Sequence, residues 1–491
     1  MWDHLCLNVI SNQESIQKLL KWFPYNKGGA FKKWYGNHEY IVNWENGGKE
    51  LHDFKPRAVI RNANFYFRKS VSWSDVTSST NAFRYYPSGF IFDGGSAHSA
   101  FSDDINKLYT CLAFGNNKFA TEIIKAINPT LHFHIGYFDV LPYPVQLEGY
   151  LYEISKNAII LSKYDWDSYE TSWDFTQNPI IRTQQPTLEL AFKAWQQQNN
   201  AAVAEMKRLE EENNKLFIEA YGLQDELTPD VPDEQITLTR ADREKDTQRL
   251  VSYAIGCMMG RYSLDEPGLI YAHAGNEGFD PNRYKKFKTD ADGIIPLTEM
   301  GWFDKDEADY RIKEFLNAVW GKDTEAENML WLAEGLAKKN NETPEEAVRR
   351  YLATKFYKDH LQTYKKRPIY WLFSSGKLGA FQALVYLHRY NESTLARMRT
   401  EYVMPLISKM AAYAKTLEDS KEASSSAAET NRIEKQLLAL HKQQAELSTF
   451  EEKLRHLADQ RITLDLDDGV KVNYGKFGDL LAEVKAVTGE K

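Results

Sequence analysis

Hydrophobic positions follow two different spacings along this chain. Between about residue 38 and residue 182, short apolar runs are separated by turn residues, a pattern typical of strands. Strands are expected at 39–44, 58–60 and 89–92. Residues 102–127 instead carry apolar side chains at helical spacing, and the polar break at 115–117 predicts two helices there. The pattern therefore predicts a mixed α and β region.

Helical spacing dominates the rest of the chain. Helices are expected at 13–22, 187–217 (one long helix or a hairpin), 242–262, 307–320, 325–338, 343–357 and 380–390. Near the end, Ile433, Leu440, Leu447 and Leu454 recur every seven residues, as in the seam of a coiled coil. We expect this seam to pack against another helix of the same chain. Residues 464–477 are expected to form a strand–turn element.

These patterns predict the α+β class, with a mixed α/β domain followed by a mainly helical region and a short coiled-coil tail. A chain of 491 residues is long enough for about two to four domains. The expected parts are a first domain at 1–183, a helical spacer at 184–235, a helical domain at 236–415 and the tail with its strand–turn element at 416–491.

Charge is distributed unevenly along the sequence. Between Lys18 and Arg84 there are 12 Lys and Arg residues against 5 Asp and Glu, a local net charge of +7. The whole chain carries −8, so the remainder carries −15. This argues against nucleic-acid binding over the whole surface and favours a local basic surface. The same stretch is rich in aromatic, Asn and Ser side chains, which can stack on bases or bond to their edges. The alternative is a basic β domain whose rings form its core.

Within residues 23–93 we predict side chains that contact double-stranded DNA through a cation, an amide or a hydroxyl group. They are Lys27, Lys32, Lys33, Asn37, Lys55, Arg57, Arg61, Asn62, Arg68, Lys69, Ser72 and Arg84. The alternative for each cation is a solvated charge, and for Arg84 a structural arginine between rings. Trp34, Trp44 and Trp73 are expected in the core.

Other chemistry has weak support. His132 and His134 are two residues apart and would share one face of a strand, but the sequence places no further metal ligand beside them. Asp465, Asp467 and Asp468 lack the spacing of a calcium loop. We also find no Ser–His–Asp set and no nuclease-like carboxylate cluster. We therefore predict no metal site and no catalytic residue.

Several short motifs carry a resemblance to a known family. They are KGGAFKKWYGN at 27–37, NWENGG at 43–48, SWS at 72–74, PSGFIFD at 87–93, LVSYAIGCMMGRYSLD at 250–265, KRPIYWLF at 366–373 and YLHRYN at 386–391. In these motifs the chain resembles the C-terminal part of PglX, the adenine-specific DNA methyltransferase of BREX phage-defence systems. The first four motifs are also similar to specificity domains of single-chain type II restriction-modification enzymes.

The resemblance implies site-specific recognition of duplex DNA for methylation of adenine at N6, which marks host DNA. Neither a Gly-rich loop for the methyl donor nor an Asn/Asp-Pro-Pro-aromatic loop for a flipped adenine is found in the sequence. We therefore expect no cofactor in this chain and no methyl transfer by it alone. The resemblance assigns S-adenosyl-L-methionine to a catalytic half outside this chain. Whether the chain is a fragment, a split subunit or an engineered protein stays open.

Double-stranded DNA and a methyltransferase catalytic domain or subunit are the partners that the resemblance implies. Other BREX proteins and phage DNA-mimic inhibitors are further candidates. A bacterial cytoplasmic location is expected, because the cysteines are few and no apolar run approaches the about 18 residues of a membrane span. Two alternatives remain: an interaction scaffold that recruits defence subunits through the helical region and tail, and an enzyme that itself methylates or cuts DNA.

Overall fold

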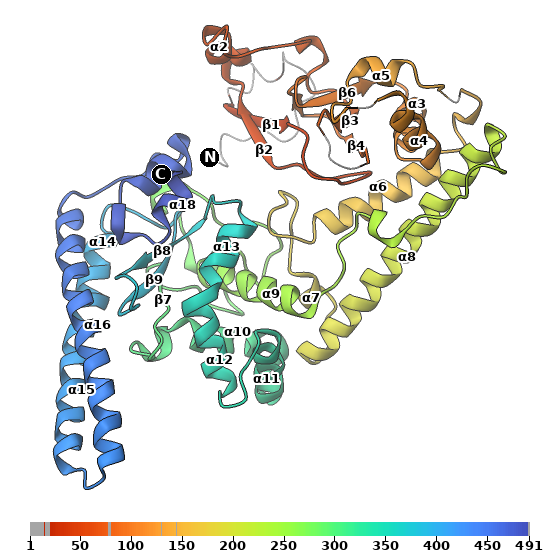
Figure 1. Ribbon diagram of the computed structural model, residues 1–491. Helices are drawn as coiled ribbons and strands as arrows, with labels where there is room; N and C mark the ends of the chain where they lie inside the picture. The colour runs from red at the N-terminus through yellow and green to blue at the C-terminus, as the bar shows by residue number, and fades with distance from the viewer. Residues whose placement is uncertain (1–13, 15–19, 77–79, 129, 144, 490–491) are drawn as a thin grey trace. The chain divides into compact units, whose positions relative to one another are not determined.

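The computed structural model describes residue 14 and residues 20–76, 80–128, 130–143 and 145–489. The chain divides into two compact units, which we call the N-terminal unit (Trp2–Phe175 with Trp195–Ala241) and the C-terminal unit (Thr176–Ala194 with Asp242–Lys491). Helix α8 (Leu188–Ala220) passes without a break from one unit into the other (Figure 1). The four-part division drawn from the sequence stays a prediction. The helix expected at 13–22 lies largely outside the described residues.

Two small sheets form the β part of the N-terminal unit. In the first, β1 (Trp22–Asn26) pairs antiparallel with β2 (Tyr40–Asn43) and parallel with β5 (Ile91–Phe92). In the second, β3 (Ser70–Ser74) lies between β4 (Phe83–Tyr86) and β6 (Ala97–Phe101), and both pairs are antiparallel.

The strand expected at 58–60 is wrong. Those residues belong to the irregular connection 54–69 between α2 (Glu45–Asp53) and β3. A run of three apolar residues is too short to specify a strand when no neighbouring strand pairs with it.

Helices α3 (Ile105–Gly115) and α4 (Lys118–Ile127) confirm the two helices expected at 102–127. The side chain of Asn117 caps α4 by accepting a hydrogen bond from the Ala120 amide at 2.6 Å. Gly115 packs so closely on a ring that an added Cβ would lie 2.3 Å from Cγ of Phe83. The polar break between the two helices therefore combines a cap with a close approach that only glycine permits.

The main core of this unit lies between β3, β4, α3, α6 (Tyr152–Trp166) and the part of α8 that belongs to it. Trp34 and Trp73 are buried in this core, and Trp44 is buried in a second, smaller cluster, so the expectation for these three rings is confirmed. The short helix α5 (Ile135–Asp139) follows His134.

The C-terminal unit is mainly helical around one antiparallel sheet of order β7–β9–β8. Its strands are β7 (Ile294–Pro296), β8 (Tyr370–Ser374) and β9 (Gln382–Tyr386). Its helices are α7 (Pro179–Arg182), α9 (Arg243–Met258), α10 (Ala308–Trp320), α11 (Glu325–Gly335), α12 (Pro344–Tyr351), α13 (Tyr357–Thr363), α14 (Thr394–Arg397), α15 (Met404–Ala423), α16 (Ala427–Asp459), α17 (Gly469–Gly475) and α18 (Val484–Thr488). In the described part of the chain, no helix combines the length and the hydrophobicity needed to cross a membrane.

Two sequence-based expectations for this unit are wrong. Residues 380–390 contain strand β9 rather than a helix, because β9 pairs with β7 on one side and β8 on the other. Residues 464–477 form a short 3-10 turn and helix α17 instead of a strand–turn element. Asn473 stabilises this turn, since its amide donates to the carbonyl oxygens of Asp465 and Gly469.

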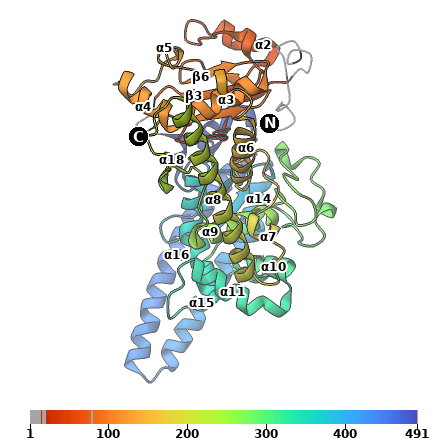
Figure 2. The same cartoon turned by 90° about the vertical axis from the view of Figure 1, so that its right-hand side faces the viewer.

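Helices α15 and α16 lie side by side as an antiparallel hairpin (Figures 1 and 2). The heptad positions of α16 are all buried, at Ile433, Leu440, Leu447 and Leu454. Only the short stretch at 424–426 separates the two helices. The seven-residue spacing thus marks the buried face of α16. The coiled-coil character of the tail stays a prediction.

A group of carboxylates surrounds Tyr402 in the C-terminal unit. The Tyr402 hydroxyl donates to Asp292 at 3.1 Å. Burial and the neighbouring Asp290 raise the pKa of Asp292 to about 7 and that of Asp306 to about 6. Arg389 lies nearby but donates to the backbone carbonyl of Asp290 at 2.8 Å. These carboxyl groups therefore bind protons more tightly in the folded state than in the unfolded chain.

The stability of the C-terminal unit is expected to fall as the pH rises from about 4 to about 7. A carboxyl group with a raised folded-state pKa contributes stability below its unfolded pKa and loses it as the pH passes the folded pKa. For Asp292 this loss is on the order of a few kcal/mol, since one pKa unit corresponds to about 1.4 kcal/mol. Asp292→Asn, whose amide does not titrate, should flatten the dependence. Urea unfolding of the parent and of Asp292→Asn at several pH values measures this. If the unfolding free energy of both proteins changed with pH in the same way, the prediction would be contradicted.

Candidate nucleic-acid interface

The structure divides the twelve predicted DNA contacts by exposure. Exposed are Lys27, Lys55, Arg57, Arg61, Asn62 and Lys69. Half-buried are Lys32 and Arg68. Buried are Lys33, Asn37, Ser72 and Arg84. A cation must lie at the surface to contact a phosphate. In the free protein, therefore, the exposed cations can do so directly, whereas the buried residues bond within the protein.

Lys33 and Trp34 share one buried carboxylate on α8. Nζ of Lys33 lies 2.5 Å from Oε2 of Glu210, and both side chains are almost completely buried. The other oxygen, Oε1, accepts a hydrogen bond from the indole Nε1 of Trp34 at 2.8 Å. A buried charge is tolerated only when it is paired and hydrogen-bonded, and this arrangement satisfies both oxygens. The basic motif at 27–37 therefore holds α8 in the core of its unit.

Lys32 makes the second anchor of the same motif. Its Nζ lies 2.7 Å from Oδ2 of Asp165 on α6 and donates to the carbonyl oxygen of Thr237 at 3.0 Å. The other carboxylate oxygen of Asp165 accepts from the amide of Thr239 at 3.1 Å. Lys32 and Lys33 thus neutralise carboxylates of the protein and join α6, α8 and the segment at 237–239.

Arg84 lies in β4 with its guanidinium inside the protein. Nη1 donates to the carbonyl oxygens of Lys32 at 3.1 Å and Ala82 at 3.2 Å, and Nη2 donates to the hydroxyl of Ser74 at 3.1 Å. A guanidinium that binds two carbonyl oxygens fixes the path of the chain before Trp34. This geometry agrees with the alternative given above, in which Arg84 is a structural arginine. A contact between Arg84 and a base stays a prediction.

Ser72 and Asn37 are likewise bonded within the protein. The hydroxyl of Ser72 donates to the carbonyl oxygen of His98 at 2.7 Å and accepts from the amide of Asn26. The amide of Asn37 donates to the carbonyl oxygen of Ala30 at 2.9 Å. Both side chains are buried, so their assignment to DNA also stays a prediction.

Four exposed cations come from one connection of the chain. We call Lys55, Arg57, Arg61 and Lys69, all between α2 and β3, the 54–69 cation group. Arg61 donates to the carbonyl oxygen of Gly94 at 3.2 Å. Among the residues that the structure describes, no carboxylate forms an ion pair with any of the four. Their charges are therefore available to neutralise phosphates.

Three candidates remain: Lys27 in the earlier basic motif, and Asn62 and Arg68 within the same connection. Lys27 is exposed, with its ammonium 5.8 Å from the ring centre of Tyr40. Asn62 is exposed in a left-handed backbone conformation, φ 50°. Arg68 is paired with Asp103 at 2.7 Å, on a carboxylate that is itself 96% exposed. An ion pair this open contributes little stability, so phosphate can replace Asp103.

The two histidines considered for a metal have neighbours that the sequence does not reveal. His132 and His134 both lie within 3.0 Å of the carboxylate of Asp75, and His98 lies against the same carboxylate. Asp75 follows β3 and His98 lies in β6, so no sequence spacing links them to residues 132–134. The pairing of β3 with β6 and the hydrogen bond from the Phe133 amide to the Asp75 carbonyl oxygen bring the four side chains together.

Comparison with known proteins gives close relatives of greater length. The chain is 43% identical over 496 aligned positions to the adenine-specific methyltransferase BrxX of Escherichia coli O9:H4 (strain HS), and the match covers 96% of this chain and 40% of that protein. It is 40% identical over 486 positions to the adenine-specific methyltransferase PglX of Lacticaseibacillus casei (strain Zhang), with the same coverage of both chains. No family model matches the chain. The chain is thus homologous to the adenine-specific methyltransferases BrxX and PglX and spans about two fifths of their length.

Proposed function

We propose that this chain recognises double-stranded DNA site-specifically for an N6-adenine methyltransferase of a BREX-type phage-defence system. The observation that carries the proposal is the homology to two adenine-specific methyltransferases over 96% of the chain. A methyltransferase with one target base must select that base within its sequence, and groove contacts to base edges supply such selection. The motifs quoted above resemble the region of PglX that performs this task.

The surface chemistry of the N-terminal unit supports the proposal. The 54–69 cation group and Lys27 are exposed. These side chains would neutralise phosphates, and exposed Asn62 has the amide that can pair with an adenine edge. Lys33 and Arg84 would act indirectly, by holding the scaffold that presents the exposed groups. The proposal therefore assigns DNA contact to fewer residues than the twelve that the sequence alone predicts.

The proposal also assigns partners and a cofactor. Methyl transfer would use S-adenosyl-L-methionine bound to a catalytic domain or subunit outside the region described here. That catalytic part would receive the adenine that this chain positions, after the base leaves the helix. Other BREX proteins and phage DNA-mimic inhibitors are further proposed partners. The place of action would be the bacterial cytoplasm, where the chromosome lies.

Selection from a random duplex pool tests the proposal. The full chain is expected to enrich one short sequence motif, and its affinity should fall steeply as salt increases. With about five phosphate contacts, log affinity against log salt should have a slope of roughly −4 to −5. Retention of all sequences alike would show binding without recognition. An affinity that does not change with salt would remove the DNA function.

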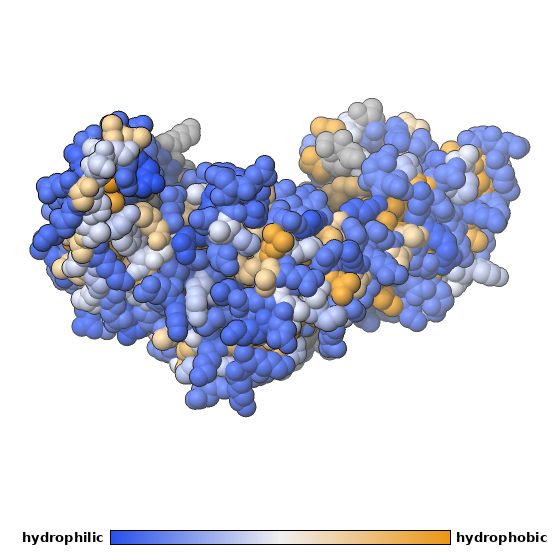
Figure 3. Space-filling view, turned by 90° about the horizontal axis from the view of Figure 1, so that it is seen from below, coloured by the Kyte–Doolittle hydropathy of each residue, from blue (hydrophilic) through white to orange (hydrophobic). Residues whose placement is uncertain are grey.

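An interaction scaffold is the second candidate function. The α15–α16 hairpin favours it, because the seam of α16 is buried while Leu438 on another face is 58% exposed. The face of the molecule in Figure 3 is mostly hydrophilic with scattered hydrophobic residues. A partner at such a surface would rely on polar contacts. Deleting 404–459 should then abolish recruitment of a defence subunit and leave DNA selection unchanged.

A further inference from the structure

Three segments of the N-terminal unit meet at the carboxylate of Asp75. The amide of Asp75 donates to the carbonyl oxygen of Ser96 at 3.0 Å, which extends the pairing of β3 with β6 by one residue. On the other side, the carbonyl oxygen of Asp75 accepts from the amide of Phe133 at 2.7 Å. Backbone bonds therefore fix the positions from which Asp75, His98 and residues 132–134 project.

Three imidazole nitrogens face this carboxylate. Nε2 of His98 and Nδ1 of His134 each lie 3.0 Å from Oδ1, and Nδ1 of His132 lies 2.7 Å from Oδ2. One ligand atom from each of Asp75, His98 and His134 lies within 4.8 Å of the other two. Two ligands of one tetrahedral Zn²⁺ ion, each about 2.0–2.1 Å from the metal, are separated by about 3.3 Å. The spacing therefore suits a metal with only small side-chain shifts.

The cluster has a buried side and an exposed side. Asp75 and His98 are buried, whereas the side chains of His132 and His134 are 53% and 60% exposed. The exposed side gives an ion access to the ligand atoms.

We propose that Asp75, His98 and His134 bind one divalent first-row transition-metal ion. Two imidazoles and a carboxylate match the ligand preference of Zn²⁺ and Co²⁺ rather than of Mg²⁺ or Ca²⁺, which take oxygen ligands. His132 is a positioning residue, because it bonds to Oδ2 and so orients Oδ1 toward the other two ligands. The bound ion would tie β3, β6 and the segment before α5 together.

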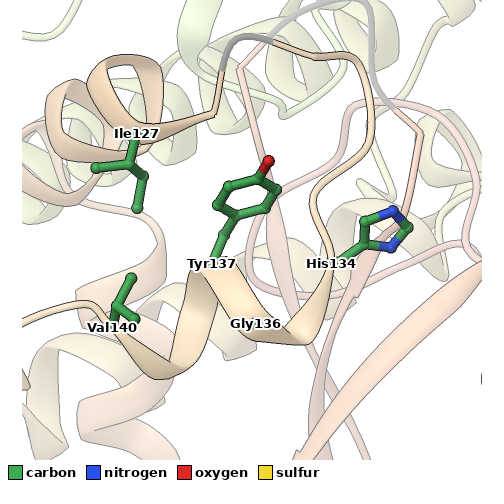
Figure 4. Close-up of a pocket in the computed structure, with 5 residues that line it drawn as sticks. All are labelled: Ile127, His134, Gly136, Tyr137 and Val140. Carbon is green, nitrogen blue, oxygen red and sulfur yellow. The ribbon is translucent and has the colours of Figure 1, made fainter.

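His134 also lines a hollow of 430 Å³, together with Ile127, Gly136, Tyr137 and Val140. Figure 4 shows the ring of Tyr137 between His134 on one side and the aliphatic pair Ile127 and Val140 on the other. Three protein ligands leave at least one position of a four-coordinate ion free, and water would fill it from the exposed side of His132 and His134.

Metal titration of the chelator-treated full chain tests the proposal, with Zn²⁺ and Co²⁺ as the probes. The parent chain should bind one Zn²⁺ and melt at a higher temperature with it, and Co²⁺ should give the visible absorption of a protein-bound ion. His134→Ala should weaken Zn²⁺ binding about 100-fold or more, and His132→Ala about 10–100-fold. The control His441→Ala changes an exposed histidine of α16 and should bind as the parent does.

Folding can be checked separately, since His134 is exposed and makes no side-chain cap for α5. Far-UV circular dichroism of His134→Ala in chelator should match the parent. Asp75→Asn, which removes the ligand charge and keeps the size, should lose binding as well. If the Co²⁺ spectrum in the presence of the parent chain equals that of the hydrated ion, the chain binds no Co²⁺ and the cluster is a hydrogen-bonded structural feature only. Equal Zn²⁺ binding by His134→Ala and His441→Ala would also overturn the proposal.

Discussion

Lys33→Ala is expected to lower the free energy of unfolding of the N-terminal unit by about 3–5 kcal/mol. The substitution leaves the carboxylate of Glu210 buried, with the Trp34 indole as its one donor among the described residues. Breaking one half of a buried ion pair costs more than the pair contributes, because the remaining charge stays away from water. Urea unfolding monitored by tryptophan fluorescence measures the loss.

Two further variants separate charge from packing. Lys49→Ala removes a lysine whose partner Asp53 is as exposed as itself, and its unfolding midpoint should stay unchanged. Lys33→Met combined with Glu210→Gln removes both charges but keeps an acceptor for Trp34, so it should recover most of the stability. If Lys33→Ala unfolds like the parent yet binds DNA with a shallower salt dependence, Lys33 reaches phosphate, as the sequence alone suggests.

Replacing all four residues of the 54–69 cation group with alanine is expected to make the salt dependence of DNA binding shallower by about 3–4 units. Each cation that contacts a phosphate contributes about −0.9 to the slope of log affinity against log salt. Because phosphate contacts carry no sequence information, binding should weaken on every duplex while the preferred motif stays the same. Fluorescence anisotropy across a salt series measures both effects.

The control variant makes the same change in net charge elsewhere. Four exposed cations of the α15–α16 hairpin serve for this purpose: Lys415, Arg432, Lys435 and Lys442. Their replacement should leave the slope near the parent value, because only cations that neutralise phosphates release counterions and so set the slope. Equal changes in both variants would mean that net charge, rather than a local surface, controls the affinity.

Local signals in the sequence predicted local structure well. The helices α3 and α4 follow from their apolar spacing, and their break follows from a glycine and an asparagine that act within a few residues. Strand β9 has apolar residues at most of its positions, a pattern that suits a helix or a strand. It lies between a near partner, β8, and a distant one, β7, which precedes it by more than eighty residues, so its central place in a sheet is not visible in its own pattern.

The candidate site shows the same limit more clearly. The basic stretch is visible in the sequence, but the fate of each charge depends on distant residues. Lys33 and Glu210 are 177 positions apart, and Lys32 and Asp165 are 133 apart. Asp75 and the three histidines around it likewise come from three separate segments, joined by strand pairing and by the Phe133–Asp75 backbone bond. Composition therefore identified the basic region, but the role of each of its residues could be assigned only from the folded structure.

The shared carboxylate of Glu210 has a consequence for the exchange of chain segments between relatives. A recombination event that replaced residues 20–175 alone would bring in a foreign partner for Glu210 on α8 and for the segment at 237–239. Residues 195–241 belong to the same unit and would have to be inherited with them. Chimeric proteins should therefore be functional when both segments come from one parent. In families that diversify by swapping, these two stretches should share a common ancestry.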